Sequence, residues 1–294
     1  MNALKDSDFP NIFIASNDAS LKSQNLYLIY TKVELILLIL AACLAVYSYS
    51  HTETKQWLNV VSGLILLATL IITIVIRHNR FEKFWYEGRA LAESVKTISW
   101  RYMTRSETFE TGEGNVDKIF IDRITELKDE FNSLVPVMKN NLLSLPFITQ
   151  KMKDVRDATL DERINHYRLY RIQDQINWYS RKAEFNRNLS NQYFWLLIIS
   201  QALAIIASVY IIVQPKTNFN FVGLFTTIAA SLLTWIQVKK YNELNTAYST
   251  TNIELVKARD TMSTILDENA FAKFVLDAEN AVSREHTTWL AQRR

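Results

Sequence analysis

Polar side chains that interrupt long apolar stretches are the first places where this sequence could do chemistry. The 294-residue chain contains four nearly uncharged runs, and hydroxyl or amide groups recur in three of them at helical spacing. The residues that share a face within each run are Ser62, Thr69 and Thr73; Gln201 and Ser208; and Thr227, Ser231 and Thr234. Such residues either join helices to one another in lipid or line a polar, uncharged pathway. The sequence leaves both interpretations open.

Signatures of catalysis and metal binding are missing from the sequence. It has no phosphate-binding loop, dinucleotide fingerprint, nucleophile elbow or zinc-protease helix. The histidines, His51, His78, His166 and His286, are far apart along the chain, and the single cysteine, Cys43, lies inside an apolar run. One cysteine cannot form a disulfide framework. We therefore expect no enzyme, and no catalytic, cofactor-binding or metal site.

The four apolar runs have the length of membrane spans. They cover Val33 to Tyr49, Trp57 to Ile76, Tyr193 to Val213, and Phe219 to Val238. Each approaches the roughly 20 residues that cross a bilayer core as a helix. Glycine and proline are scarce, with 5 and 4 residues, which disfavours hairpin-rich β structure. The predicted fold class is all-α: an integral membrane protein with four transmembrane helices and long helices that extend into a cytoplasmic helical domain.

Linker lengths and charges predict how the spans pair and which way they point. The linkers 51–56 and 214–220 are short and hold one basic residue each, so the spans are expected to form two hairpins with these linkers outside. The segments expected are an N-terminal cytoplasmic segment (1–32), the first hairpin (33–76), a cytoplasmic helical domain (77–192), the second hairpin (193–238) and C-terminal cytoplasmic helices (239–294). Both termini of this multi-pass protein of the cell's inner (plasma) membrane are predicted to be cytoplasmic. A net charge of +3 gives no indication of nucleic-acid binding.

The predicted cytoplasmic helices carry the second group of candidate residues. A capping box of Thr159 and Glu162 starts a helix that meets no breaker before Pro215, which predicts one helix over 160–213. It should pair antiparallel with the helix that follows Arg77, approaching it closely at Ala90, Ser94 and Thr97. The candidate assembly residues are Trp85, Arg89, Glu93, Trp100, Trp178, Tyr179 and Arg181. We expect the aromatic ones to fill packing seams, with an aromatic ligand cage as the alternative.

Three long segments resemble the SLATT-type family of bacterial two- and four-span membrane effectors. They are FWYEGRALAESVKTISWRYM (84–103), PFITQKMKDVRDATLDERINHYRLYRIQDQINWYSRKAEFN (146–186), and FVLDAENAVSREHTTWLAQR (274–293). The likeness runs from about residue 20 to the end of the chain, in a plan of two spans and a long helix that occurs twice. The family offers no catalytic residues, so Arg89, Glu93, Arg171, Asp174 and Gln175 carry over as structural or assembly positions.

The resemblance implies a role in bacterial conflict and anti-phage systems. Family members are thought to oligomerise and permeabilise the membrane when a nucleotide signal or an invader is sensed. The expected function is therefore a homo-oligomeric, pore-forming or membrane-disrupting effector that is triggered through its cytoplasmic helices. Its expected partners are the lipid bilayer, further copies of the chain, and a nucleotide signal or cytoplasmic sensor protein. The alternative is a non-conducting membrane anchor or scaffold that recruits a soluble partner.

Overall fold

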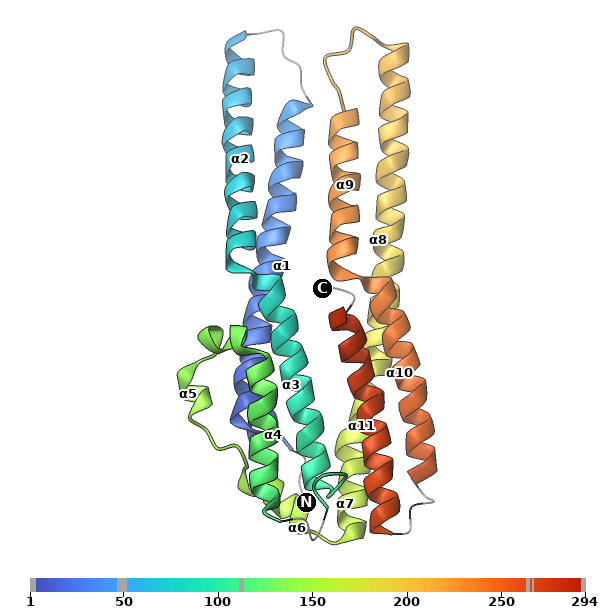
Figure 1. The fold of residues 1–294 in the computed structure, drawn as a ribbon. Coiled ribbons are helices and arrows are strands. Elements are labelled where there is room, and N and C mark those ends of the chain that lie inside the picture. The colour runs from blue at the N-terminus through green and yellow to red at the C-terminus, as the bar shows by residue number, and fades with distance from the viewer. Residues whose placement is uncertain (1–3, 47–51, 111–113, 263–264, 266, 292–294) are drawn as a thin grey trace. The chain divides into compact units, whose positions relative to one another are not determined.

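A computed structural model describes residues 4–46, 52–110, 114–262, 265 and 267–291 (Figure 1). These residues form helices, short turns and connecting loops, and no β-strand occurs among them. Four of the described helical stretches are long and apolar enough to cross a membrane: Asn11–Ala45, Gln56–Met103, Leu160–Val213 and Val222–Thr261. The predicted all-α membrane class is confirmed. The pairing of the spans as two hairpins stays a prediction.

The first half of the chain runs from α1 to α6. Its elements are a 3₁₀ turn at Asp6–Asp8, α1 (Asn11–Ala45), α2 (Thr52–Asn79), α3 (Phe81–Met103), α4 (Val116–Glu130), a 3₁₀ turn at Asn132–Val137, α5 (Asn140–Leu143) and α6 (Gln150–Asp157). Pro136 and the run of loop residues around Pro146 interrupt helix formation here, as proline's missing N–H requires. The end predicted for the first span, 47–49, lies outside the described residues.

The second half contains the longest helix. Its elements are α7 (Leu160–Tyr167), a π-helical segment (Arg168–Gln173), α8 (Asp174–Val213), α9 (Val222–Lys239), α10 (Tyr241–Thr261) and α11 (Glu268–Ala291). The predicted capping box is present, because the Thr159 hydroxyl accepts from the Glu162 N–H and the Glu162 carboxylate accepts from the Thr159 N–H. The predicted helix over 160–213 is also confirmed as one stretch of 54 residues.

The described chain divides into two compact units, which we treat separately. Unit 1 gathers 1–24, 82–183 and 246–294, and unit 2 gathers 25–81 and 184–245. Both units therefore draw on both halves of the sequence. The division falls within α1, α8 and α10, so these three helices belong partly to each unit.

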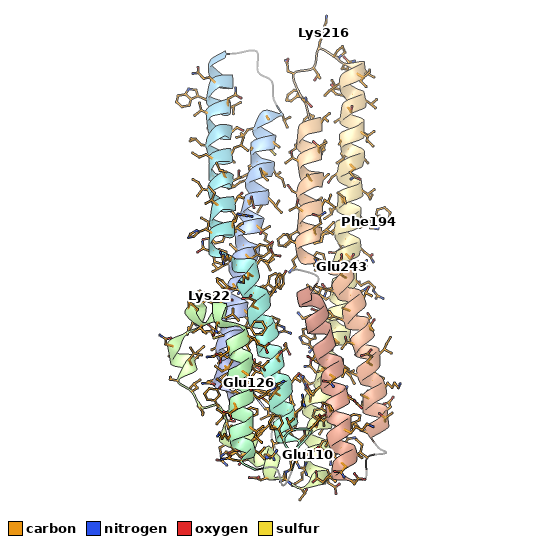
Figure 2. The ribbon with its side chains drawn as sticks, viewed as in Figure 1. Lys22, Glu110, Glu126, Phe194, Lys216 and Glu243 are labelled. Atoms are coloured by element: carbon orange, nitrogen blue, oxygen red, sulfur yellow. The ribbon has the colours of Figure 1, made fainter. Side chains whose placement is uncertain are left out.

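Unit 2 has the surface of a protein whose solvent is lipid. Large apolar side chains are widely exposed on it, including Leu64 on α2 and Ile205 and Ile212 on α8, the last at 76%. Phe194, labelled in Figure 2, is exposed on α8 as well. Soluble proteins avoid contiguous apolar surface of this extent, because water penalises it. The exposed apolar helices are therefore the membrane-spanning part.

In unit 2 the same backbone turn follows both α2 and α9. Arg80, between α2 and α3, and Lys240, between α9 and α10, both have φ of 49°, in the left-handed region. In both places the next residue is aromatic and stacks on a tyrosine of the helix that enters the spans. Phe81 lies on Tyr30 at 5.7 Å between ring centroids, and Tyr241 lies on Tyr193 at 5.4 Å. The repeated plan expected from sequence thus extends to local backbone geometry.

Unit 1 has a buried apolar core of the kind found in soluble helical proteins, and the N-terminal segment is part of it. Phe9, Ile12 and Phe13 are each 3% exposed and belong to one cluster with Trp100 of α3 and Phe271 of α11. The resemblance seen in the sequence begins only at about residue 20, so these residues lay outside it. Their apolar spacing is the signal that identifies them as one face of a helix.

A close helix contact in unit 1 joins α1 and α3 at Gly88. A Cβ at Gly88 would lie 3.0 Å from the Ser16 carbonyl oxygen and 3.0 Å from the Ser20 Cβ. The Ser20 hydroxyl also donates to the Trp85 carbonyl oxygen at 2.9 Å. An added methyl group would press against α1, so glycine allows the two helices to lie this close.

Replacing Gly88 with alanine should lower the stability of the solubilised protein by about 1–3 kcal/mol, because the packed helices must separate. The matched control is Gly63→Ala on α2, where an added Cβ meets nothing within 4 Å. Thermal unfolding followed by circular dichroism in detergent measures both. A Gly88→Ala variant that melts with the wild-type protein would contradict this account of the α1–α3 contact.

Candidate functional site

A fully buried ion pair between Arg171 and Glu279 lies at the centre of unit 1. Arg171 donates from Nε to one carboxylate oxygen of Glu279 at 2.8 Å and from Nη2 to the other at 2.7 Å. The Tyr167 hydroxyl donates to the same carboxylate at 2.9 Å. Arg171 is 1% exposed and Glu279 is 0% exposed. A charge at such depth is tolerated only with a well-placed partner, and a two-point guanidinium–carboxylate contact is the best available geometry.

Electrostatics fix the charge state of the guanidinium in this pair. Burial alone would lower the pKa of Arg171, but the carboxylate of Glu279 more than offsets burial and leaves the pKa above its ordinary value. Burial raises the pKa of Tyr167, and the Glu279 charge adds to that effect. The tyrosine therefore stays a neutral donor, and the arginine stays charged.

The backbone around Arg171 departs from α-helical geometry. Residues Arg168–Gln173 form a π-helical segment within the helix that begins at Leu160. Such segments are rare and concentrate at functional sites, because they rotate side chains away from the regular helical register. Arg171 also keeps a buried Nη1 atom with no hydrogen-bond partner among the described residues. The pair is thus strong but incompletely satisfied.

Two further buried arginines cap the end of α3. Arg156 donates to the carbonyl oxygens of Tyr102 at 2.5 Å and Phe109 at 2.8 Å. Arg163 donates to the carbonyl oxygen of Thr104 at 3.0 Å and pairs with Glu268 of α11. The last carbonyl groups of a helix have no partner within it, so these guanidinium groups satisfy them and stabilise the helix end.

Helix α11 is held against the rest of unit 1 by both charges and apolar contacts. Its inward stripe is Phe271, Val275, Glu279 and Val282, at helical spacing and all at most 2% exposed. The Ser106 hydroxyl donates to the Ala272 carbonyl oxygen at 2.5 Å. Glu279 is therefore the one charged member of an otherwise apolar stripe within the described part of α11.

A buried histidine lies beside this network. His166 is 3% exposed, with its ring 5.9 Å from that of Trp100 and 4.8 Å from that of Tyr170. Neither ring nitrogen has a hydrogen-bond partner among the described residues. Burial, reinforced by the positive charge of Lys151, lowers the pKa of His166 to about 4. The imidazole is neutral at physiological pH.

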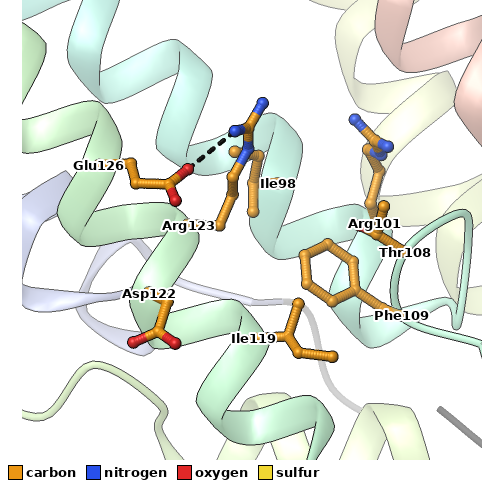
Figure 3. A pocket seen from close by; sticks show the side chains of 8 residues that line it. All are labelled: Ile98, Arg101, Thr108, Phe109, Ile119, Asp122, Arg123 and Glu126. Carbon is orange, nitrogen blue, oxygen red and sulfur yellow. Dashed lines mark hydrogen bonds and ion pairs between the residues drawn. The ribbon is translucent and has the colours of Figure 1, made fainter. Parts of the chain in front are cut away.

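A cleft of about 490 Å³ opens between α3 and α4 (Figure 3). Its lining residues are Ile98, Arg101, Thr108, Phe109, Ile119, Asp122, Arg123 and Glu126. Arg123 and Glu126 pair at 2.9 Å, whereas Arg101 lies across the cleft from Asp122. The Nε atom of Arg101 is buried without a partner in the described part of the chain. The walls of the cleft thus carry charges of both signs.

Among the described residues, no group of three or more histidine, cysteine, aspartate or glutamate side chains could hold a metal ion.

The polar residues predicted on the spans do not form one continuous stripe in a single copy. Thr69 and Ser231 are buried, Ser62 and Thr227 are half-buried, and Thr73, Gln201, Ser208 and Thr234 are exposed. Thr227 and Thr234 donate to carbonyl oxygens four residues earlier in α9, at 2.7 and 2.9 Å. Thr73 reaches another helix, because its hydroxyl donates to the Glu34 carboxylate of α1 at 2.5 Å.

The predicted aromatic seam divides among several helix contacts. Trp100 packs edge-on against Tyr167, with 5.6 Å between the ring centroids. Trp178 and Tyr179 instead contact Tyr248 of α10, at 5.2 and 5.6 Å. Trp85 is buried near the contact that α3 makes with α1 at Gly88. The close approach expected between α3 and the helix over 160–213, at Ala90, Ser94 and Thr97, stays a prediction.

The charged assembly candidates lie on helix surfaces. Arg89 and Glu93 form an ion pair within α3 at 2.8 Å. Arg181 is exposed and donates to the Asn177 carbonyl oxygen, one turn earlier in α8, at 3.2 Å. Sequence reasoning missed Glu279, Arg156 and Arg163. The sequence does hold a signal for Glu279, because this single charged residue interrupts the apolar stripe of α11.

These features define a class: an all-helical, multi-pass membrane protein whose spans are joined to a helical unit with buried charges. Family comparison identifies it further. Residues 10–164 match the model described as SMODS and SLOG-associating 2TM effector domain 3, and residues 167–289 match that of domain 1. The chain therefore belongs to the SLATT family of membrane effectors, with two such domains in tandem. A comparison with curated proteins and one with solved structures each find no significant match.

Neutralising Glu279 should destabilise unit 1 strongly. Glu279→Gln leaves the buried Arg171 charge uncompensated, at a cost of about 3 kcal/mol or more. The double variant Arg171→Met with Glu279→Leu removes both charges and should recover most of that loss. The matched control is Glu126→Gln, at an exposed pair, which should cost less than about 1 kcal/mol. Thermal unfolding in detergent distinguishes them, and equal losses for the two Glu→Gln variants would contradict the role given to the buried pair.

Acidification should destabilise the protein through His166. The folded state keeps the imidazole neutral down to about pH 4, whereas the unfolded chain takes up the proton near pH 6.5. Stability is therefore lost progressively as the pH falls from 6.5 to 4, by up to about 3 kcal/mol from this residue. His166→Phe keeps a ring and removes the proton site, so its melting temperature should fall less over this range. Parallel pH profiles for the two proteins would exclude the effect.

Proposed function

We propose that this protein is a homo-oligomeric effector of a bacterial anti-phage or related conflict system that permeabilises the inner membrane. It acts through its helices and not as an enzyme. Both termini and unit 1 face the cytoplasm, as the basic residues that flank the spans favour. Membership of the family of 2TM effector domains supports the general role.

The observation that carries the proposal is the continuity of one helix. The stretch Leu160–Val213 holds Arg171 of the buried ion pair near its start and the third apolar span at its end. An unbroken helix is stiff along its axis because each turn is hydrogen-bonded to the next. A change in the docking of α11 would remove the counter-ion of Arg171, and the π-helical segment beside it gives the helix a place to change register.

The trigger acts on unit 1. A nucleotide signal or a cytoplasmic sensor protein is the expected stimulus, and the cleft beside Arg101 is the candidate site for a small ligand. The guanidinium there offers an unused buried donor to a polar group of such a ligand.

Polar groups on the lipid-facing surface support assembly of several copies. Gln201 and Ser208 share one face of α8 and are both exposed. An amide in contact with hydrocarbon is unfavourable unless it finds a hydrogen-bond partner or water. A neighbouring copy would supply the hydrogen-bond partner, and a water-filled pathway between copies would supply the water. The pathway has no charged ring, so it is expected to be weakly ion-selective.

Leakage from vesicles tests the proposal. Full-length protein reconstituted in liposomes should release an entrapped dye once the trigger is supplied, and Gln201→Leu with Ser208→Leu should reduce release at least tenfold by making the pathway apolar. Ala202→Leu is the matched control, because it adds bulk at an exposed position on another face of α8.

The outcomes separate a pore from a scaffold. Loss of leakage in the double Leu variant, with the control unaffected, supports the pore. Wild-type protein that forms oligomers but releases no dye with any nucleotide or sensor tried would contradict permeabilisation. Cellular protection retained in the double Leu variant would favour the alternative, a membrane anchor that recruits a soluble partner.

A further inference from the structure

The cleft between α3 and α4 presents two charges of opposite sign that the protein itself does not match. Arg101 donates from Nη2 to the Glu107 carbonyl oxygen at 3.1 Å, but its Nε atom is buried without a hydrogen-bond partner among the described residues. Asp122 lines the other side of the cleft (Figure 3), and its carboxylate forms no hydrogen bond or ion pair within the described ranges. A buried donor without an acceptor is unfavourable, so a ligand that supplies the acceptor is stabilised there.

The other two charged residues of the cleft compensate each other. Arg123 and Glu126, both on α4, form an ion pair at 2.9 Å. The charges left over are therefore one positive group on α3, Arg101, and one negative group on α4, Asp122. Burial lowers the pKa of Arg101, so its surroundings do not fully compensate the positive charge. A ligand that fits both walls carries a negative group at one end and a positive group at the other.

The surface between these charges is apolar. Ile98, Phe109 and Ile119 line the cleft together with the charged groups. Figure 3 shows the Phe109 ring and the Ile119 side chain between the guanidinium of Arg101 and the carboxylate of Asp122. The volume of about 490 Å³ is in the range of small-molecule sites, which combine an apolar lining with a few polar groups. The body of the ligand is therefore expected to be apolar.

The loop on one side of the cleft is held in a strained conformation. Thr108 lines the cleft and has φ of 69°, in the left-handed region that a β-branched side chain rarely adopts. The next residue is fixed on both sides, because the Phe109 N–H donates to the Ser106 carbonyl oxygen at 2.9 Å and the Phe109 carbonyl oxygen accepts from Arg156 at 2.8 Å. Strain that is held in this way is concentrated at ligand-binding sites.

The same loop also contacts α11. The Ser106 hydroxyl donates to the Ala272 carbonyl oxygen of that helix at 2.5 Å, and the carbonyl oxygen of the next residue, Glu107, is the one that Arg101 holds. A ligand on Arg101 would therefore bind next to the segment that docks α11. The cleft and the buried ion pair of α11 are linked through one short loop.

We propose that this cleft binds a small zwitterion with an apolar body, such as a free apolar amino acid or a dipeptide of such residues. The carboxylate of the ligand accepts from Nε of Arg101, its ammonium group donates to Asp122, and its side chain rests on Phe109 and Ile119. Binding does not depend on membrane permeabilisation. Only the further step, in which the ligand acts as the trigger through the loop and α11, rests on the function proposed above.

Calorimetric titration of the full chain in detergent tests the site, with L-leucine and L-leucyl-L-leucine as the probes. Saturable binding of at least one of them is expected. The N-acetylated and the C-amidated forms of that compound should each bind about tenfold more weakly, because each lacks one charged contact. Absence of saturable binding by both probes, or equal affinity for the free and the blocked forms, would overturn the proposal.

Two variants assign each end of the ligand to its wall. Asp122→Asn, at an exposed position, should weaken binding about tenfold and should no longer distinguish the free from the N-acetylated compound. Arg101→Gln should likewise lose the distinction between the free acid and the amide. The matched control is Asp129→Asn, also exposed on α4 but outside the cleft, which should bind as the wild-type protein does. An equal loss in the Asp122 and Asp129 variants would contradict the site.

Two further measurements separate this proposal from its alternatives. Inorganic phosphate that binds in an Arg101-dependent way, while neither zwitterion binds, would make the cleft a simple anion site and contradict the proposal. Dye release from liposomes is measured in parallel with the same compounds. Binding without release supports the site and contradicts only its role as the trigger, whereas release without binding overturns the site and leaves permeabilisation intact.

Discussion

The two-point contact between Arg171 and Glu279 is the interaction on which unit 1 depends. Both groups are withdrawn from water, so each is tolerable only while the other is present. An apolar pair would hold α11 as firmly and would not be sensitive to the loss of one partner. The buried charges make docking of α11 closer to all-or-none, which suits the signalling role that we propose for this helix.

The two tandem SLATT domains share an asymmetric plan. In each, the helix that enters the spans is unbroken, α1 in one and α8 in the other, whereas the helix that leaves is interrupted by a left-handed basic residue, Arg80 or Lys240. Neither residue is glycine, although glycine would adopt this conformation without strain. Positive side chains at the membrane boundary account for the choice.

The sequence predicts the parts of this structure that depend on local or one-dimensional patterns. Apolar run length identifies the spans, and the Thr159–Glu162 spacing fixes the start of the long helix. What it could not supply are contacts between segments far apart in the chain. Gly88 is only a weak point in a helix until Ser16 and Ser20 are placed against it. The sequence can mark Glu279 as a charge on an apolar stripe, but not identify its partner, Arg171, 108 positions away.

Hydrogen exchange resolved by mass spectrometry tests the central claim, that the buried pair couples α11 to the helix leading into the third span. In the wild-type protein, backbone amides of α11 and of residues 168–173 should exchange slowly. In Glu279→Gln both segments should lose protection together, while α4 keeps its own. Loss of protection confined to α11, with residues 168–173 unchanged, would contradict the coupling.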